Sequence, residues 1–229
     1  MKEKKLLIFD ADDTLWESAL YFRRAEEDFV ALMQSLGFDP EEIRAEVQIK
    51  DSERLIHTGY GARPYIDTLR RILESKVNPT TPYMHAQLDI ILNLLLNHPL
   101  ILQPGVIKTL NTLTNLSKQM IVYTMGEKEH QSDKYIRSGI THHFADCVVV
   151  PLKTTDSMLE LLNRFSVHPY EACMIGNSPK SDINPATACG VNAIYFRRSN
   201  GWQAEQTNLL HPQLIKTVNN FNEILPYLQ

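Results

Sequence analysis

Residues 6–15 of the chain are Leu6-Leu7-Ile8-Phe9-Asp10-Ala11-Asp12-Asp13-Thr14-Leu15. Four apolar residues lead directly into a segment that holds three carboxylates and a threonine. A short, continuous apolar run is typical of a strand buried on both faces, as in a parallel sheet. Such a strand delivers the residues after it to the carboxyl edge of the sheet, where open α/β folds bind ligands.

The carboxylates of this segment allow two interpretations. Asp10, Asp12 and Asp13 would repel one another at a strand end, and this favours a bound cation. Alternatively, the Asp residues simply form a turn or cap the next helix. The segment by itself does not distinguish between the two.

The order of four short segments along the chain adds a resemblance. Asp-x-Asp-x-Thr, from Asp10 to Thr14, resembles the first motif of the haloacid dehalogenase-like superfamily. Three later segments resemble its second, third and fourth motifs, each at or just after an apolar run: Ile121 to Thr124, Lys153 after Val148 to Pro151, and Gly176 to Asp182. The resemblance covers Lys5 to Leu15 and the chain from Leu102 onward. The segment between them matches only in its placement and helical character.

Composition sets limits on the class of protein. The chain has 229 residues, of which 43% are hydrophobic, enough for one large α/β domain or a core with a small accessory domain. A net charge of -4 predicts no nucleic-acid partner. The three cysteines sit in or beside apolar runs, as expected of buried free thiols in a reducing compartment. We see no signal peptide and no apolar run long enough to span a bilayer, so we expect a soluble cytoplasmic protein, either a monomer or a homodimer.

Residues 17–98 have the periodicity of amphipathic helices and contain no convincing strand. The pattern predicts helices at residues 18–36, 40–57 with a break near Asp51, 63–73 and 84–96. In the superfamily that the chain resembles, a helical cap domain inserted between the first two motifs covers the active site. The alternative is a plain helical domain that only adds stability.

Strands and helices alternate after this block. The predicted strands are residues 120–124, 146–151, 172–175, 192–196 and 214–218, and the predicted helices are residues 105–116, 127–138, 156–165, 185–189 and 222–228. This alternation implies a parallel sheet with right-handed crossovers. We therefore predict a Rossmann-like α/β core formed by residues 1–16 and 99–229, with an all-helical cap at residues 17–98.

The first segment provides two chemical groups. The Asp10 carboxylate can attack a phosphoryl group to form an aspartyl-phosphate, and Mg²⁺ would bridge this anion and the phosphate. Asp12 points the same way along an extended chain, so it can protonate the leaving alcohol and then deprotonate water. The resemblance implies these same roles, and it adds that the Asp12 backbone carbonyl binds Mg²⁺.

The later segments provide groups for the phosphate and the metal. The Thr124 hydroxyl and the N–H groups of Met125 and Gly126 can donate to phosphoryl oxygens. Lys153 would hold Asp10 and the phosphate together. Asp182 and Asn177 would complete the metal shell. In the helical block, Arg63 is the residue that we expect to contact substrate, because it follows the flexible segment Gly59 to Gly61.

Two residues depart from the superfamily pattern. Asn177 stands where the fourth motif commonly has Asp, so it can ligate a metal through its amide oxygen but supplies no charge. Asp13 stands where Gly is common, and this is tolerable because Asp accepts unusual turn geometry.

The presence of Asp12 separates two chemistries. The haloacid dehalogenases keep the nucleophile but lack this second Asp, because a halide leaves without a proton. We therefore predict a Mg²⁺-dependent phosphohydrolase that acts on a small phosphate monoester through an aspartyl-phosphate. Two alternatives remain, namely a phosphomutase of the same superfamily and a catalytically weak binding protein, for which Asn177 is the only support.

Overall fold

The structure is a computed structural model that describes residues 4–198 and 205–228. Residues 1–3, 199–204 and 229 of the predicted core domain lie outside the described residues. The chain divides into two compact units, one of Met1–Ala19 with Leu100–Gln229 and the other of Leu20–Pro99. The sequence predicted these boundaries at residues 16/17 and 98/99.

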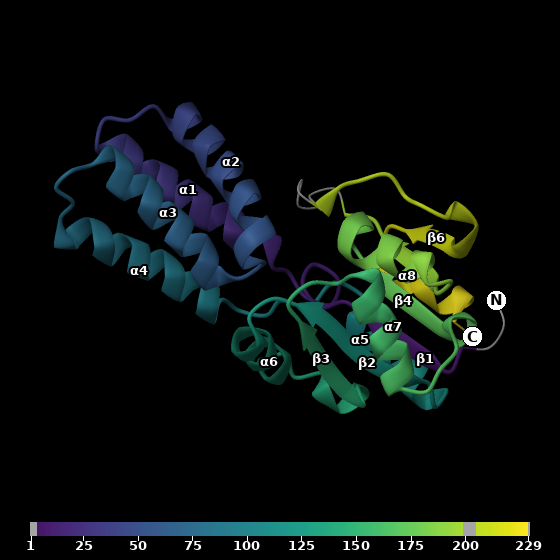
Figure 1. Cartoon of the computed structure of the whole chain (residues 1–229). Helices are drawn as coiled ribbons and strands as arrows, with labels where there is room; N and C mark the ends of the chain where they lie inside the picture. The colour runs from purple at the N-terminus through teal and green to yellow at the C-terminus, as the bar shows by residue number, and fades with distance from the viewer. Residues whose placement is uncertain (1–3, 199–204, 229) are drawn as a thin grey trace. The chain divides into compact units, whose positions relative to one another are not determined.

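The first unit, which we call the core unit, is built on a six-stranded parallel sheet with the strand order β3-β2-β1-β4-β5-β6 (Figure 1). The strands are β1 Leu6–Phe9, β2 Gln119–Met125, β3 Asp146–Val150, β4 Ala172–Gly176, β5 Asn192–Phe196 and β6 Ile215–Val218. The predicted α/β class with a Rossmann-like parallel sheet is therefore confirmed. Since β1 lies between β2 and β4, the segments that follow these three strands meet at one edge of the sheet.

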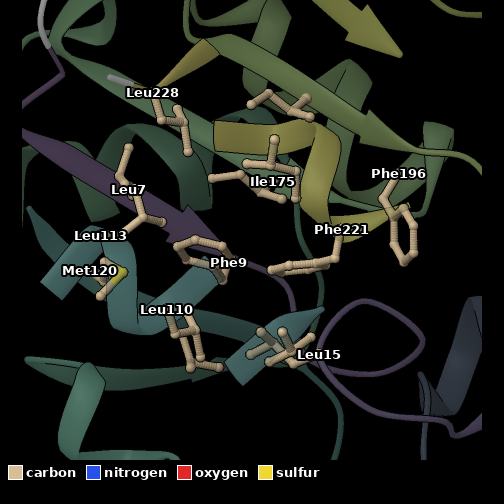
Figure 2. Packing of buried hydrophobic residues seen from close by; sticks show 14 of the residues in the cluster. Leu7, Phe9, Leu15, Leu110, Leu113, Met120, Ile175, Phe196, Phe221 and Leu228 are labelled. Carbon is tan, nitrogen blue, oxygen red and sulfur yellow. The ribbon is translucent and has the colours of Figure 1, made fainter. Parts of the chain in front are cut away.

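The strand β1 is apolar throughout because both of its faces are covered. Leu7 and Phe9 belong to a core cluster on one face, and Leu6 and Ile8 to a cluster on the other. This alternation is the two-residue period of an extended chain. Figure 2 shows the first cluster, where the ring of Phe9 stacks with that of Phe221 at 6.2 Å between centroids. Aromatic pairs of this kind add about 0.5–1.5 kcal/mol beyond their buried area.

The helices between the strands are α5 Val106–Asn115, α6 Lys128–Arg137, α7 Thr155–Arg164 and α8 Asn184–Ala188. Two C-terminal features add to the prediction. The helix predicted at residues 222–228 is present as the 3₁₀ helix Phe221–Tyr227, which contains Pro226. A π-helical turn, Pro179–Ile183, precedes α8, and no pattern in the sequence predicted it.

The second unit, which we call the helical unit, contains α1 Ala19–Ser35, α2 Pro40–Thr58, α3 Ala62–Lys76 and α4 Pro82–Asn97 (Figure 1). Asp39 caps α2 by accepting from the N–H groups of Glu41 and Glu42. The predicted break near Asp51 is wrong. Asp51 instead accepts from Arg54 Nε at 2.8 Å, one turn later in the same helix, so the two side chains support a continuous α2. Among the described residues, no helix combines the length and apolar composition needed to cross a membrane.

Candidate active site

The candidate site lies at the carboxyl edge of the core sheet. Asp10 follows β1 directly, and its N–H still donates to the carbonyl of Ile175 in β4 at 2.9 Å. This bond holds the backbone of Asp10 in the sheet, and its side chain is buried. Thr124 lies within β2 at the same edge, and Lys153 follows β3.

The centre of the site is a buried lysine between two carboxylates. Lys153 Nζ lies 2.5 Å from Asp10 Oδ1 and 2.6 Å from Asp182 Oδ1, and the side chain of Lys153 is 1% exposed. Burial raises the pKa values of both Asp10 and Asp182. Burial would lower the pKa of Lys153, but the two carboxylates more than offset this and raise it. The lysine is therefore held as a cation that faces Asp10, and its predicted contact with a phosphate stays a prediction.

Asp182 reaches this position through the π-helical turn. Its Oδ2 accepts from the N–H of Ser178 at 2.9 Å, so both of its carboxylate oxygens have protein donors. The carboxylate also packs against Gly176, where a Cβ would lie 2.4 Å from Asp182 Oδ2. Any side chain at residue 176 would displace Asp182, and this close approach is the reason for glycine at the end of β4. Direct metal ligation by Asp182, which the sequence predicted, would require one of its two hydrogen bonds to be exchanged.

A cluster of oxygen atoms lies beside the other oxygen of Asp10. Thr14 Oγ1 donates to Asp10 Oδ2 at 2.8 Å. One terminal position of the Asn177 amide lies 3.2 Å from Asp10 Oδ2, 3.1 Å from the Asp12 carbonyl oxygen and 3.1 Å from Thr14 Oγ1. Because the neighbouring atoms are acceptors, the amide nitrogen fits this position and donates to them. Only if the amide turned over would its oxygen lie here and the cluster consist entirely of oxygen atoms.

An all-oxygen cluster of this kind suits Mg²⁺, a hard cation that binds carboxylate, carbonyl and water oxygens. The described residues include no group of three or more His, Cys, Asp or Glu side chains arranged to hold a metal. The cluster instead combines the Asp10 carboxylate with the Asp12 carbonyl and the Asn177 amide. These residues would fit a Mg²⁺ ion only if the Asn177 amide turned over and gave up the hydrogen bonds that its nitrogen makes here.

The side chain of Asp12 is held by three donor side chains that were not among the site residues predicted from the sequence. They are Trp16, Gln131 and Lys134, whose nitrogen atoms lie 2.6 to 3.0 Å from the carboxylate oxygens of Asp12. Burial would raise the pKa of Asp12, but Lys134 and the other donors hold it well below its usual value. Gln131 and Lys134 are three residues apart, so they share one face of α6, and this spacing was the only available signal.

Asp13 has a structural role, in agreement with the turn-and-cap interpretation. It has a φ of 61°, and its carboxylate accepts from the N–H groups of Ser18 and Ala19 at 2.9 to 3.1 Å. Burial raises its pKa to about 6. Of the three carboxylates, Asp13 therefore forms the turn that leads into α1, whereas Asp10 and Asp12 face other polar groups of the site.

The groups predicted to bind phosphate are only partly available. The Thr124 side chain is buried at the edge that also holds Asp10. The N–H of Gly126, however, donates to the carbonyl of Val150 at 3.1 Å, so in this structure it is committed to the sheet and not available to a phosphoryl oxygen. The carbonyl of Met125 accepts from Gln131 Nε2 at 2.9 Å. Arg63 is exposed on α3, in the helical unit, so substrate contact by Arg63 remains a prediction.

Proteins of known name or structure are similar to this chain over most of its length. Glyceraldehyde 3-phosphate phosphatase from Methanopyrus kandleri is 26% identical over 211 residues, which are 89% of this chain and 88% of the relative. A haloacid dehalogenase-like family hydrolase from Xanthomonas campestris has a similar structure, with a TM-score of 0.83, 24% identity, and coverage of 98% of this chain and 91% of the other. The putative HAD-hydrolase YfnB from Bacillus subtilis, solved bound to magnesium, has a TM-score of 0.67 at 16% identity, with both chains fully covered.

A family model gives the assignment. The model described as haloacid dehalogenase-like hydrolase matches residues 4–190, which include all four of the segments that surround Asp10. The structure brings the Asp10, Lys153 and Asp182 side chains of these segments into direct contact. The chain belongs to the haloacid dehalogenase-like hydrolase family.

Proposed function

We propose that this hydrolase removes the phosphoryl group from a small phosphate monoester through an aspartyl-phosphate on Asp10. The observation that carries the proposal is the ion pair of Asp10 with the buried Lys153, beside Thr14 and next to a second carboxylate, Asp12. A carboxylate held by a cation and a hydroxyl is oriented for nucleophilic attack, and it needs no deprotonation first.

The proposed reaction has two steps. Asp10 attacks phosphorus and the bond to the ester oxygen breaks, while Asp12, which has taken up a proton from solvent when the substrate binds, gives that proton to the leaving oxygen. Because Lys134 and the other donors favour the ionised form of Asp12, this proton uptake requires Asp12 to exchange one of its contacts. Asp12 then takes a proton from a water molecule that attacks the aspartyl-phosphate, so inorganic phosphate is released and Asp10 is regenerated. Lys153 offsets the negative charge of Asp10 and of the phosphoryl oxygens in both steps.

Magnesium fits the oxygen cluster described above. Asp10 Oδ2, the Asp12 carbonyl and the Asn177 amide oxygen would hold the ion, which would reduce the repulsion between Asp10 and the substrate phosphate. Asp182 would act beside the ion through its contact with Lys153. The magnesium bound to the Bacillus relative supports this cofactor.

The relatives support a small substrate. The relative from Methanopyrus kandleri is named for a three-carbon phosphate ester. The test is to measure phosphate release from triose phosphates, phosphoserine, phosphoglycolate, sugar phosphates and nucleotides, with and without Mg²⁺. We expect phosphate release that depends on Mg²⁺. Absence of release from every ester would contradict the proposal, and conversion to an isomer without free phosphate would indicate a mutase.

Replacing Asp12 with Asn should slow turnover of an alkyl phosphate by about 10²–10⁴-fold, the range for a lost general acid–base group. The alcohol leaving group needs a proton, whereas a nitrophenolate does not. The first step should therefore be impaired much less for an aryl phosphate. Rapid-quench measurement of the first step with both substrates checks this. Equal slowing of the two would contradict the role of Asp12 as acid.

Replacing Asn177 with Asp should lower the Mg²⁺ concentration that gives half-maximal activity. A carboxylate attracts a hard cation more strongly than an amide oxygen does. The measurement is a Mg²⁺ titration of activity in both proteins at several substrate concentrations, because the added charge also opposes binding of the substrate phosphate. If half-saturation stays unchanged while the variant remains folded, Asn177 is not a direct ligand.

We also propose that the helical unit selects the substrate, with Arg63 as one of its contacts. Arg63 is exposed near the start of α3, two residues after Gly61 and four after Gly59, which both have positive φ angles. Replacing Arg63 with Ala should change the ranking of substrates by kcat/KM more than it changes hydrolysis of a small aryl phosphate. Arg71→Ala, at an exposed position of the same helix, is the control. A uniform change across substrates would assign Arg63 no role in selection.

A further inference from the structure

We propose that Lys134 and Gln131 are positioning residues for Asp12. Together with Trp16, they hold the Asp12 carboxylate next to the end of β2. They would affect the reaction through Asp12, the carboxylate that both of them contact. This inference rests on the proposed function, because the acid–base role of Asp12 is itself proposed.

The contacts of Asp12 define one orientation of its carboxylate. Oδ1 accepts from Trp16 Nε1 at 2.8 Å and from Lys134 Nζ at 2.6 Å. Oδ2 accepts from Lys134 Nζ at 2.6 Å and from Gln131 Nε2 at 3.0 Å. Each oxygen thus has two donors, and a rotation of the carboxylate would break contacts on both sides. Surface carboxylates are seldom held in this way, because long exposed side chains lose entropy when they are fixed.

Lys134 is not an ordinary surface lysine. Its residue is 1% exposed, and its charge lies inside the core unit. A buried ammonium group is costly unless a carboxylate compensates for it, and Asp12 is the carboxylate that pairs with Lys134 among the described residues. The pair adds little net stability over an apolar replacement of similar size. Its clearer consequence is the fixed position of Asp12.

Gln131 connects Asp12 to the strand that carries Thr124. Its Nε2 donates to Asp12 Oδ2 at 3.0 Å and to the carbonyl of Met125 at 2.9 Å. If the Gln131 amide were turned over, its Oε1 would face two acceptors, Asp12 Oδ2 and the Met125 carbonyl oxygen. In the present orientation the buried Oε1 has no hydrogen-bond partner among the described residues, a cost that the two donated bonds offset. Asp12 is therefore tied to the strand end where the phosphoryl group is proposed to bind.

Asp10 and Asp12 each have a separate lysine. Lys153 contacts Asp10 and Asp182, whereas Lys134 contacts Asp12. Loss of Lys134 therefore leaves the ion pair of the nucleophile intact. Displacement of a catalytic group by about 1 Å can cost on the order of 10²-fold in rate. A change at Lys134 should accordingly reduce the steps that need Asp12 and leave the others nearly unchanged.

The experiment is a double-mutant cycle between Lys134→Met and Asp12→Asn, measured on an alkyl phosphate and on p-nitrophenyl phosphate. We expect Lys134→Met to lower kcat for the alkyl phosphate by about 10–10²-fold with KM changed less than about twofold, as for a displaced catalytic group. The first step with the aryl phosphate should change much less. In the Asp12→Asn background, Lys134→Met should cause no further loss.

Two further variants keep this test decisive. Gln131→Leu removes one donor to Asp12 but leaves the ion pair between Lys134 and Asp12 in place. It should lower kcat less than Lys134→Met does, and again more for the alkyl than for the aryl phosphate. This variant therefore tests the proposal even if Lys134→Met does not fold. Lys108→Met makes the same substitution at an exposed position of α5 and should leave the kinetics unchanged. Thermal unfolding of each variant separates loss of folded protein from loss of rate.

The outcomes distinguish the positioning role from the proposed function. Equal losses on both substrates, or a full further loss in the Asp12→Asn background, would make Lys134 a structural residue only. Normal turnover by Asp12→Asn itself would overturn both the acid–base role and the positioning. If the native protein releases no phosphate from any ester, the proposed function has failed, and the positioning role fails with it.

Discussion

Replacement of Asp10 with Asn is expected to abolish phosphate release, with a loss of about 10⁴-fold or more, the scale on which enzymes respond to removal of a covalent nucleophile. An amide is a poor nucleophile, and it cannot form the ion pair that Lys153 now makes with Asp10 Oδ1 at 2.5 Å. The measurement is phosphate release from the best ester of the substrate screen, with the variant purified away from any native enzyme. Turnover near the native rate would show that another group attacks phosphorus.

Chemical trapping adds a direct test of the same prediction. Asp12→Asn should still form the aspartyl-phosphate from an aryl phosphate, because that leaving group needs no proton, but it should hydrolyse the intermediate slowly. Acid quenching of this variant should therefore trap one phosphoryl group, and peptide mapping should place it on Asp10. The double variant Asp10→Asn with Asp12→Asn is the control and should trap none. Phosphate found on another residue would contradict the assignment.

Replacement of Lys153 with Met should produce the largest loss of stability. Lys153 is buried between Asp10 and Asp182, so its removal leaves two neighbouring carboxylates without their cation. Breaking a buried ion pair from one side costs about 3–5 kcal/mol. For a chain of this size, each kcal/mol lowers Tm by about 2–4 °C. Urea and thermal unfolding measure the loss, and activity should disappear in the same variant.

A second substitution tests the cause of that loss. Lys153→Met combined with Asp182→Asn removes one of the two facing charges, so the double variant should be more stable than Lys153→Met alone. The exposed Lys108→Met should stay within about 0.5 kcal/mol of the native protein, as for most surface changes. A Lys153→Met variant as stable as the native protein would show that the two carboxylates do not need this lysine.

The sequence determined the fold and the place of Asp10 at the end of a buried strand because both follow from local patterns. Apolar runs of strand length alternate with helical periodicity, and a chain of that kind forms a parallel sheet. Parallel strands present their carboxyl ends together, so the segments around Asp10, Thr124, Lys153 and Asp182 could be expected at one edge. The contacts of Lys153 with Asp10 and Asp182 agree with that expectation.

Local sequence patterns predict strands and helices, but they do not predict which acceptor a given backbone N–H finds or which way a side-chain amide faces. The sequence suggested donation from Gly126 to a phosphoryl oxygen, whereas in the structure its N–H bonds to Val150 of the neighbouring strand. Asn177 could be recognised as an unusual residue in its motif. Its distances to Asp10 and to the Asp12 carbonyl, on which a metal site depends, arise only when β1 and β4 pair.

The tertiary structure alone decided how Asp12 is held. Gln131 and Lys134 are 119 and 122 residues away from Asp12 along the chain, and they lie on a strongly polar helix whose sequence suggests an exposed surface. Periodicity reveals which apolar side chains are buried, because they avoid water whatever their neighbours are. A polar side chain is buried only where a partner of matching charge and geometry compensates for the lost water. That partner is defined by distance in space, and so the lysine of Asp12 became visible only in the folded chain.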